Sequence, residues 1–189
     1  MPKIVEEEKI YRAAIMTVTE RGYGRATTKQ IAEVAEISEV TLFRKYGNKA
    51  QLVKQAIVSM VKQIDFASAT AYTGDAEADM LRIAQMYQDS ADKHGQFFYI
   101  MLSEIPRHPE LGELMGAPLH MINSVSNLLL RYQQEGILEK EDPYHAVAGL
   151  LGPLIATNMI RNASVLASLP PIDLPKHIAH FLNGRLQSK

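Results

Sequence analysis

The chain has 189 residues and a formal net charge of −1, and it is long enough to bury a hydrophobic core as one large domain or two small ones. It contains no cysteine, which excludes disulfides, thiol catalysis and cysteine-based zinc sites. The acidic N-terminus is unlike a signal peptide, and no apolar stretch approaches the ~20 residues of a membrane span, so we expect a cytoplasmic protein with no membrane partner.

The first predicted helix covers residues 5–22, where Ile10, Ala14 and Val18 recur on one face and Gly22 is placed to end the helix. Charge is uneven along the chain. Residues 1–50 hold nine Lys or Arg and seven Asp or Glu, whereas the remainder holds eleven and fourteen. This distribution is typical of a protein that contacts DNA only through its N-terminal part, and it predicts an affinity that depends strongly on salt.

Residues 27–49 have the pattern of two short helices joined by a tight turn. Thr27 and Thr28 precede a run of apolar residues at helical spacing, where a hydroxyl side chain caps a helix. Ser38 stands before the next such run, and the turn between them falls at Glu36. This pattern predicts a helix-turn-helix, whose second helix enters a major groove of DNA.

The same stretch resembles the DNA-binding region of the TetR family of bacterial transcriptional regulators. The matching features are the Thr-Thr start, I-A-x-x-A in the first helix, S-x-x-T-L-aromatic in the second, and aromatic-x-x-Lys at 46–49. Motifs carry the resemblance over about residues 8–55, and architecture carries it beyond them. It implies an all-α fold, with a three-helix helix-turn-helix DNA-binding domain over residues 1–49 and a helical ligand-binding and dimerisation domain over residues 50–189.

The resemblance also implies which residues contact DNA. Thr28 would hold a phosphate at the start of its helix, Lys29 would reach a base or a phosphate, and Arg44 would meet guanine or the backbone. Lys45 and Lys49 would neutralise phosphates. The full expected set is Thr27, Thr28, Lys29, Glu39, Val40, Thr41, Phe43, Arg44, Lys45 and Lys49.

Three residues of this segment depart from the family's pattern. Glu36 stands where the family usually has glycine; a left-handed residue there would cost glutamate about 1 kcal/mol, so we expect the turn to differ slightly from that of the family. Val40 replaces a small residue and makes the reading surface bulkier and more apolar. Phe43 replaces a tyrosine that usually binds phosphate, and it lacks the hydroxyl needed for that contact; it can equally be a core residue.

The next predicted helix is capped by Asn48, runs from residue 49 into the sixties, and would join the DNA-binding head to the body. Residues 66–74 are expected to close that helix and form a loop. A further helix is predicted from Asp75 or Asp79 to about Gly95, followed by a short apolar helix that ends at Pro106.

Helix signals continue to the end of the chain. A helix is expected to restart at Pro109, and a long one stops at Gly136. Asp142-Pro143 is a strong helix start, and Pro153 inside that helix is expected to kink or end it. Prolines at 170, 171 and 175 indicate a linker before a last helix. The apolar residues of that last helix are Leu174, Ile178, Phe181, Leu182 and Leu186.

These two late helices carry apolar and small residues, as the four-helix interface of a twofold homodimer requires. Packing within one monomer is the alternative. Two copies are also expected because two half-site readers need a fixed spacing.

The body is rich in methionine and aromatic residues, which suit an adaptable apolar pocket as well as an ordinary core. As a set they suggest a site for a small apolar or aromatic effector of unknown identity. The expected ligand-binding residues are Met60, Ile64, Met86, Tyr87, Phe97, Phe98, Met101, Met121 and Asn158. A ligand that prefers one dimer conformation would change the spacing of the heads and release DNA.

Two other functions are compatible with the sequence. One is an all-helical dimeric interaction protein without specific operator recognition. The other is an enzyme, for which only His177-x-x-His180 and Asp142-x-x-His145 have a spacing that could share a metal. No Glu-x-x-His pair, glycine-rich phosphate loop, HExxH or GxSxG motif is present. We therefore expect no catalysis, no metal and no cofactor, and a ligand-responsive regulator, most simply a repressor, with double-stranded DNA as its partner.

Overall fold

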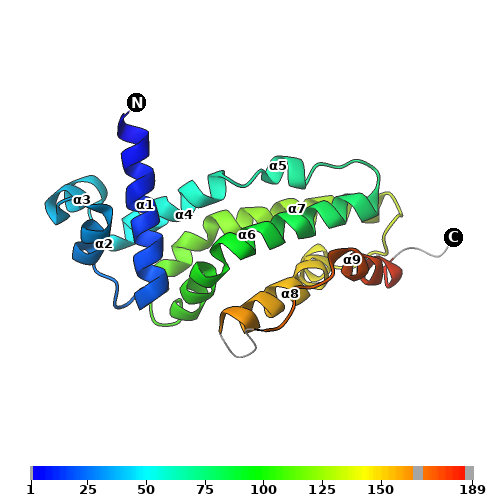
Figure 1. The fold of residues 1–189 in the computed structure, drawn as a ribbon. Coiled ribbons are helices and arrows are strands. Elements are labelled where there is room, and N and C mark those ends of the chain that lie inside the picture. The colour runs from blue at the N-terminus through cyan, green and yellow to red at the C-terminus, as the bar shows by residue number, and fades with distance from the viewer. Residues whose placement is uncertain (1, 164–167, 186–189) are drawn as a thin grey trace. The chain divides into compact units, whose positions relative to one another are not determined.

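The computed structural model describes residues 2–163 and 168–185, and the elements that these residues form are helices. The fold is all-α, as predicted (Figure 1). The α-helices are α1 (Pro2–Arg21), α2 (Thr28–Ala35), α3 (Glu39–Tyr46), α4 (Lys49–Lys62), α5 (Phe66–Ala69), α6 (Ala76–Glu104), α7 (Gly116–Gln134), α8 (Pro143–Asn162) and α9 (Leu174–Asn183), and η1 (Pro109–Met115) is a 3-10 helix.

The chain forms two compact units. The first contains residues 1–63 and 96–117, and the second contains residues 64–95 and 118–189. Helix α6 runs without interruption from the second unit into the first. The division into a DNA-binding domain ending at residue 49 and an effector domain beginning at residue 50 stays a prediction.

Two apolar clusters hold the first unit together. One joins α1, α2, α3 and the start of α4, and its members are Ile10, Ala13, Ala14, Ile31, Ala32, Ala35, Leu42, Tyr46 and Leu52. The small side chains of Ala32 and Ala35 let the helices approach closely at their crossing, as their spacing in the sequence predicted. The other cluster joins α1, α4, the end of α6 and η1, and it contains Val18, Tyr23, Ala26, Val53, Ile57, Met60, Phe97, Met101 and Leu111.

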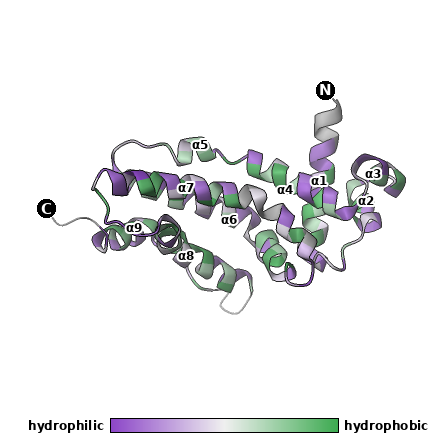
Figure 2. Cartoon of the chain, turned by 180° about the vertical axis from the view of Figure 1, so that it is seen from behind, coloured by the Kyte–Doolittle hydropathy of each residue, from purple (hydrophilic) through white to green (hydrophobic). Residues whose placement is uncertain are grey.

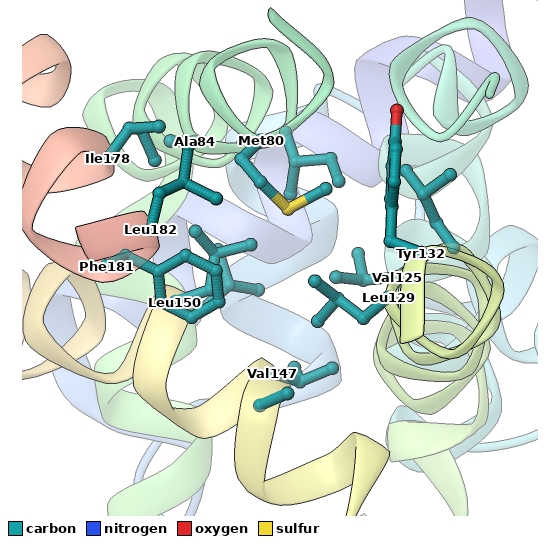
Figure 3. Packing of buried hydrophobic residues seen from close by; sticks show 14 of the residues in the cluster. Met80, Ala84, Val125, Leu129, Tyr132, Val147, Leu150, Ile178, Phe181 and Leu182 are labelled. Atoms are coloured by element: carbon teal, nitrogen blue, oxygen red, sulfur yellow. The ribbon is translucent and has the colours of Figure 1, made fainter. Parts of the chain in front are cut away.

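The described residues of the second unit share a large core between α6, α7, α8 and α9. Figure 3 shows Met80 and Ala84 of α6, Leu129 of α7, Leu150 of α8 and Phe181 of α9 lying together. Coloured by hydropathy, the helices alternate between hydrophobic and hydrophilic segments along their length, as expected for helices with one buried face (Figure 2). The apolar residues predicted for the last helix therefore lie in this core, except Leu186, which is outside the described residues.

A buried carboxylate fastens the start of α6 to α7. Asp79 accepts hydrogen bonds from the backbone N–H of Thr73 at 2.9 Å, from the Thr73 hydroxyl at 2.6 Å and from the Tyr132 hydroxyl at 2.6 Å. Arg82 also pairs with it at 2.9 Å. Burial alone would raise the pKa of Asp79, but these hydrogen bonds hold that pKa below its usual value.

The predicted break at Gly95 is wrong, because α6 continues to Glu104 as one helix. Glycine weakens a helix without removing a backbone hydrogen bond, so packing can override its low propensity. Here a side chain at position 95 would lie 3.0 Å from the amide nitrogen of Asn162. Gly95 is therefore the residue that lets the end of α8 lie close against α6.

Other element boundaries also differ from the prediction. The segment after α4 contains the short helix α5, capped by Asp65, and the restart at Pro109 is a 3-10 helix before α7 begins. Helix α8 continues through Pro153 to Asn162, so that proline does not end it. Pro175 belongs to the first turn of α9, where its missing N–H has no helical partner to lose.

Candidate nucleic-acid interface

Hydrogen-bonded caps fix the ends of the two short helices. Thr27 caps α2 by accepting from the backbone N–H of Gln30 at 3.2 Å, and the Gln30 side chain accepts from the N–H of Thr27 at 3.1 Å. Ser38 caps α3 by accepting from the N–H of Thr41 at 3.1 Å. These caps confirm the helix starts that the hydroxyl residues predicted.

The turn between α2 and α3 is left-handed at Glu36, with φ 57° and ψ 40°. Glu36 therefore adopts the conformation that favours glycine, despite its steric cost to glutamate. The Lys9 side chain of α1 pairs with the Glu36 carboxylate. This hydrogen bond and the lysine charge hold the pKa of Glu36 below its usual value. The strained turn is thus tied to the first helix.

Helix α3 buries one face and exposes the other. Leu42 and Tyr46 point into the core, whereas Val40 is 77% exposed and Phe43 is 62% exposed. Arg44 is exposed as well, one turn beyond Val40. A large apolar side chain left this exposed beside a cation is not explained by packing within the unit, so Phe43 is not a core residue.

Several predicted DNA-binding side chains already have partners within the chain. Lys45 pairs with Glu7 at 2.9 Å, and the Thr28 hydroxyl donates to Glu39 at 2.7 Å. The Lys49 ammonium donates to backbone carbonyls in the loop between α1 and α2, and it lies 4.1 Å from the centroid of the Tyr23 ring. These partners come from segments distant in sequence, so residue spacing gave no signal for them.

The loop between α1 and α2 is contacted by the last residue of α6, Glu104, and by His108, which follows that helix. His108 packs edge-on against Tyr23, and its Nε2 lies 3.4 Å from the carboxylate of Glu104. A side chain at Gly22 would lie 3.2 Å from Glu104, and one at Gly24 would lie 3.2 Å from His108. The glycines therefore allow this close approach. Sequence analysis missed His108 and Glu104 because nothing in their local pattern indicates a contact with the loop.

Residues 10–56, which include α2, α3 and the caps described above, match the family described as bacterial regulatory proteins, tetR family. The chain belongs to the TetR family. It is a transcriptional regulator with a DNA-binding helix-turn-helix at its N-terminal end. The all-helical arrangement that the resemblance implied is confirmed together with the family.

Relatives and solved structures extend the similarity beyond residues 10–56. An uncharacterized HTH-type transcriptional regulator of Mycobacterium tuberculosis is 24% identical over 166 residues, covering 87% of this chain and 79% of that protein. The uncharacterized HTH-type regulator YvkB of Bacillus subtilis is 37% identical over 76 residues, 40% of each chain. The fatty acid degradation regulator FadR from Bacillus halodurans has a TM-score of 0.72 at 16% identity, over 94% of this chain and 93% of that one. That structural likeness shows a shared fold.

The residues expected to bind an effector in this TetR-family chain fall into two groups. Met60, Phe97 and Met101 are buried together in the second cluster of the first unit, with Phe98 packed against them. In the second unit, Tyr87 and Met121 pack against the large core, Asn158 is buried on α8, and Ile64 and Met86 are half-buried. Burial raises the pKa of Tyr87. Contact of any of them with an effector stays a prediction.

The described residues form neither a candidate metal site nor a membrane-spanning helix. No three His, Cys, Asp or Glu side chains in that part gather closely enough to hold a metal ion. The spacing of His177 and His180 had made them candidate metal ligands. In the structure the Nε2 of His177 lies 2.7 Å from the carbonyl oxygen of Leu150. Over the same residues, every helix is too short or too polar to cross a membrane.

Proposed function

We propose that this TetR-family regulator is a repressor that acts in the cytoplasm, binds a palindromic operator as a homodimer and leaves it when a small apolar or aromatic effector binds. The observation that carries the proposal is the exposed face of α3. Val40, Phe43 and Arg44 lie on that face without support from the core, in the helix that the family inserts into DNA. Apolar side chains there can contact thymine methyl groups, and Arg44 can pair with guanine.

Phosphate contacts would come from the cations around α3. Lys29 is exposed on α2, and Lys45 is exposed at the end of α3. The partner of Lys45, Glu7, is itself 41% exposed, and an ion pair in such a position stabilises a protein by less than about 1 kcal/mol. A phosphate can therefore replace Glu7 at little cost. Lys49 supports the loop before α2 through its bonds to the carbonyls of Tyr23 and Ala26.

Dimerisation is supported by the outer face of α8. Tyr144, Ile155, Met159 and Ile160 on this helix are exposed by 56%, 36%, 39% and 39%. Gly152 lies between them with open space where a side chain would be. An apolar stripe interrupted by a glycine permits close approach of a second helix, as a twofold interface between copies requires.

The class of effector is proposed from the apolar side chains around α4 and the end of α6. Met60 and Met101 can adapt to different ligands, and Phe97 offers an aromatic surface. One protein that shares the fold, FadR from Bacillus halodurans, is described as a fatty acid degradation regulator. Helix α6 has residues in both units. A ligand that displaces α6 would therefore change operator affinity.

Selection of binding sites from random duplex DNA tests the operator part of the proposal. The expected result is one enriched palindrome, bound by two copies of the chain, with an affinity that falls steeply as salt rises. A reporter gene placed behind that palindrome should be repressed by the protein. Enrichment of no sequence would support instead an interaction protein without operator recognition.

A ligand screen tests the effector part. Fatty acids, their thioesters and aromatic compounds would be added to the complex of the protein with its operator. We expect at least one class to raise the melting temperature of the protein and to weaken operator binding. A compound that raises the melting temperature without changing operator affinity would contradict the proposed release.

A further inference from the structure

The exposed face of α3 contains one carboxylate, and a side chain of α2 donates a hydrogen bond to it. Glu39 is the first residue of α3 and is exposed. One of its oxygens, Oε1, accepts a hydrogen bond from the Thr28 hydroxyl at 2.7 Å. The capping of α2 does not use this hydroxyl, because Thr27 supplies the cap. Thr28 is thus available to orient Glu39.

Glu39 shares the exposed face of α3 with Val40, Phe43 and Arg44. Phe43 follows it by four residues, so the two side chains are neighbours on the helix surface, and Val40 and Arg44 form a second such pair beside them. The other acidic residues that make ion pairs around this helix, Glu7 and Glu36, are neutralised by Lys45 and Lys9. No described lysine or arginine makes an ion pair with Glu39.

A carboxylate at this position has few acceptable partners in a complex with DNA. Phosphates repel it, so it lowers affinity wherever it lies near the backbone. Base edges in the major groove offer hydrogen-bond donors only at the N4 amino group of cytosine and the N6 amino group of adenine. Adenine also presents its N7 acceptor beside the donor, which disfavours a carboxylate, whereas cytosine presents the donor alone.

We propose that Glu39 selects a cytosine at one position in each operator half-site, by accepting a hydrogen bond from its N4 amino group. Thr28 acts as a positioning residue. Its hydrogen bond to Oε1 orients the Glu39 carboxylate, and Oε2 is left to accept the hydrogen bond from cytosine. This inference rests on the proposed operator binding and adds the base that the chain prefers.

Glu39 also has a simpler role that the test must separate. A negative charge in the first turn of a helix is stabilised by the helix dipole. That role needs no particular base, so removing the charge would change affinity for all sequences alike. Selection for a cytosine would change it at one position only.

The experiment compares sequence selection by the full-length wild type, Glu39→Gln and Thr28→Val on the same library of random duplexes. Glu33→Gln is the matched control, because it removes the same charge from an exposed position on α2. In the wild type and in the control, a cytosine should be enriched at one position of each half-site. Glu39→Gln should reduce its preference over the other bases roughly tenfold and favour adenine there, since glutamine pairs with adenine.

Thr28→Val keeps the shape and the cap of α2 but removes the orienting hydroxyl, so it should relax the same position by a smaller factor. A second measurement replaces that cytosine in the selected operator by N4-methylcytosine. Wild-type affinity should fall roughly tenfold, and the affinity of Glu39→Gln should not change. Circular dichroism of each variant establishes that the helices are intact.

Two results would overturn the inference. If Glu39→Gln enriches the same cytosine as the wild type, or gains affinity equally for all sequences, Glu39 has only the intramolecular role, while operator recognition itself stands. If the wild type enriches no sequence, the proposed operator binding fails, and the assignment to Glu39 fails with it. A Glu39→Gln variant that does not fold leaves the decision to Thr28→Val and to the N4-methylcytosine operator.

Discussion

The ring of His108 packs edge-on against the ring of Tyr23, with centroids 5.1 Å apart and planes at 69°. Tyr23 is almost fully buried in the loop that leads into the helix-turn-helix, and His108 follows the end of α6. Glu104, the last residue of α6, approaches the same loop at Gly22. A displacement at the end of α6 would therefore be transmitted directly to the segment that precedes α2.

Replacing His108 by alanine is expected to destabilise the protein by about 1 kcal/mol, because an aromatic contact against a buried tyrosine is lost. Urea denaturation followed by circular dichroism measures this change. Arg107→Ala is the control, since Arg107 is exposed beside His108. Equal stability of the two variants would show that the contact with Tyr23 contributes nothing.

Replacing Glu36 by glycine is expected to raise the melting temperature slightly, because glycine adopts the left-handed conformation without steric cost. The loss of the exposed ion pair with Lys9 opposes this gain only weakly. Glu33→Gly is the control, because it places glycine inside α2 and should destabilise by roughly 1 kcal/mol. A lower melting temperature for Glu36→Gly would mean that the Lys9 contact outweighs the backbone strain.

Replacing Asp79 by asparagine is expected to cost about 2 kcal/mol at pH 7, because buried hydrogen bonds to a charged group are lost. The pKa of Asp79 is lowered in the folded state, so its extra stabilisation is present above the ordinary value of 3.8 and is lost as pH falls below it. The difference between wild type and variant should thus shrink in acid.

Urea denaturation at a series of pH values from 7 to about 2.5 measures this difference directly. Asp89→Asn serves as the comparison, since Asp89 is exposed and accepts a hydrogen bond only from the Gln85 side chain among the described contacts. A constant difference between wild type and Asp79→Asn over this range would contradict a lowered pKa.

Replacing Arg44 by alanine is expected to reduce affinity for the selected operator by about tenfold to a hundredfold without changing the fold. Mobility-shift titrations at several salt concentrations separate the two roles proposed for Arg44. A base contact relaxes selectivity at one position, whereas a phosphate contact weakens binding to all sequences and reduces the salt dependence. Arg12→Ala, on the exposed face of α1, should have little effect; unchanged operator binding by Arg44→Ala would remove it from the interface.

Replacing Met159 by aspartate is expected to dissociate the proposed dimer, because a charge would be buried in an apolar interface. Sedimentation equilibrium measures the state of association, and operator affinity should fall with it. Val58→Asp is a matched control, because Val58 and Met159 are both 39% exposed but lie in different units. A dimer of unchanged affinity in the Met159 variant would exclude this face of α8 from the interface.

The local structure of the head could be predicted from residues that act on their immediate neighbours. Hydroxyl and amide side chains at Thr27, Ser38 and Asn48 cap the helices that follow them, and the turn between α2 and α3 falls at Glu36, where the sequence placed it. Caps and turns depend on bonds three or four residues apart, which sequence spacing records. The same reasoning failed at Gly95, where packing of a long helix outweighs the low propensity of one residue, and of the two outcomes predicted for Pro153 the structure excludes the end of the helix.

The sequence by itself determined the all-α class, the helix-turn-helix and the exposure of Arg44 on α3, while the place of Phe43 stayed open until the structure showed it exposed. Only the tertiary structure decided the partners of Thr28, Lys45, Lys49 and His108, because each partner comes from another element and its distance depends on how helices cross. The Thr28–Glu39 bond shows the difference. Residue spacing placed Thr28 at the start of a helix. Only the packing of α2 against α3 brought its hydroxyl to the Glu39 carboxylate on the exposed face of α3.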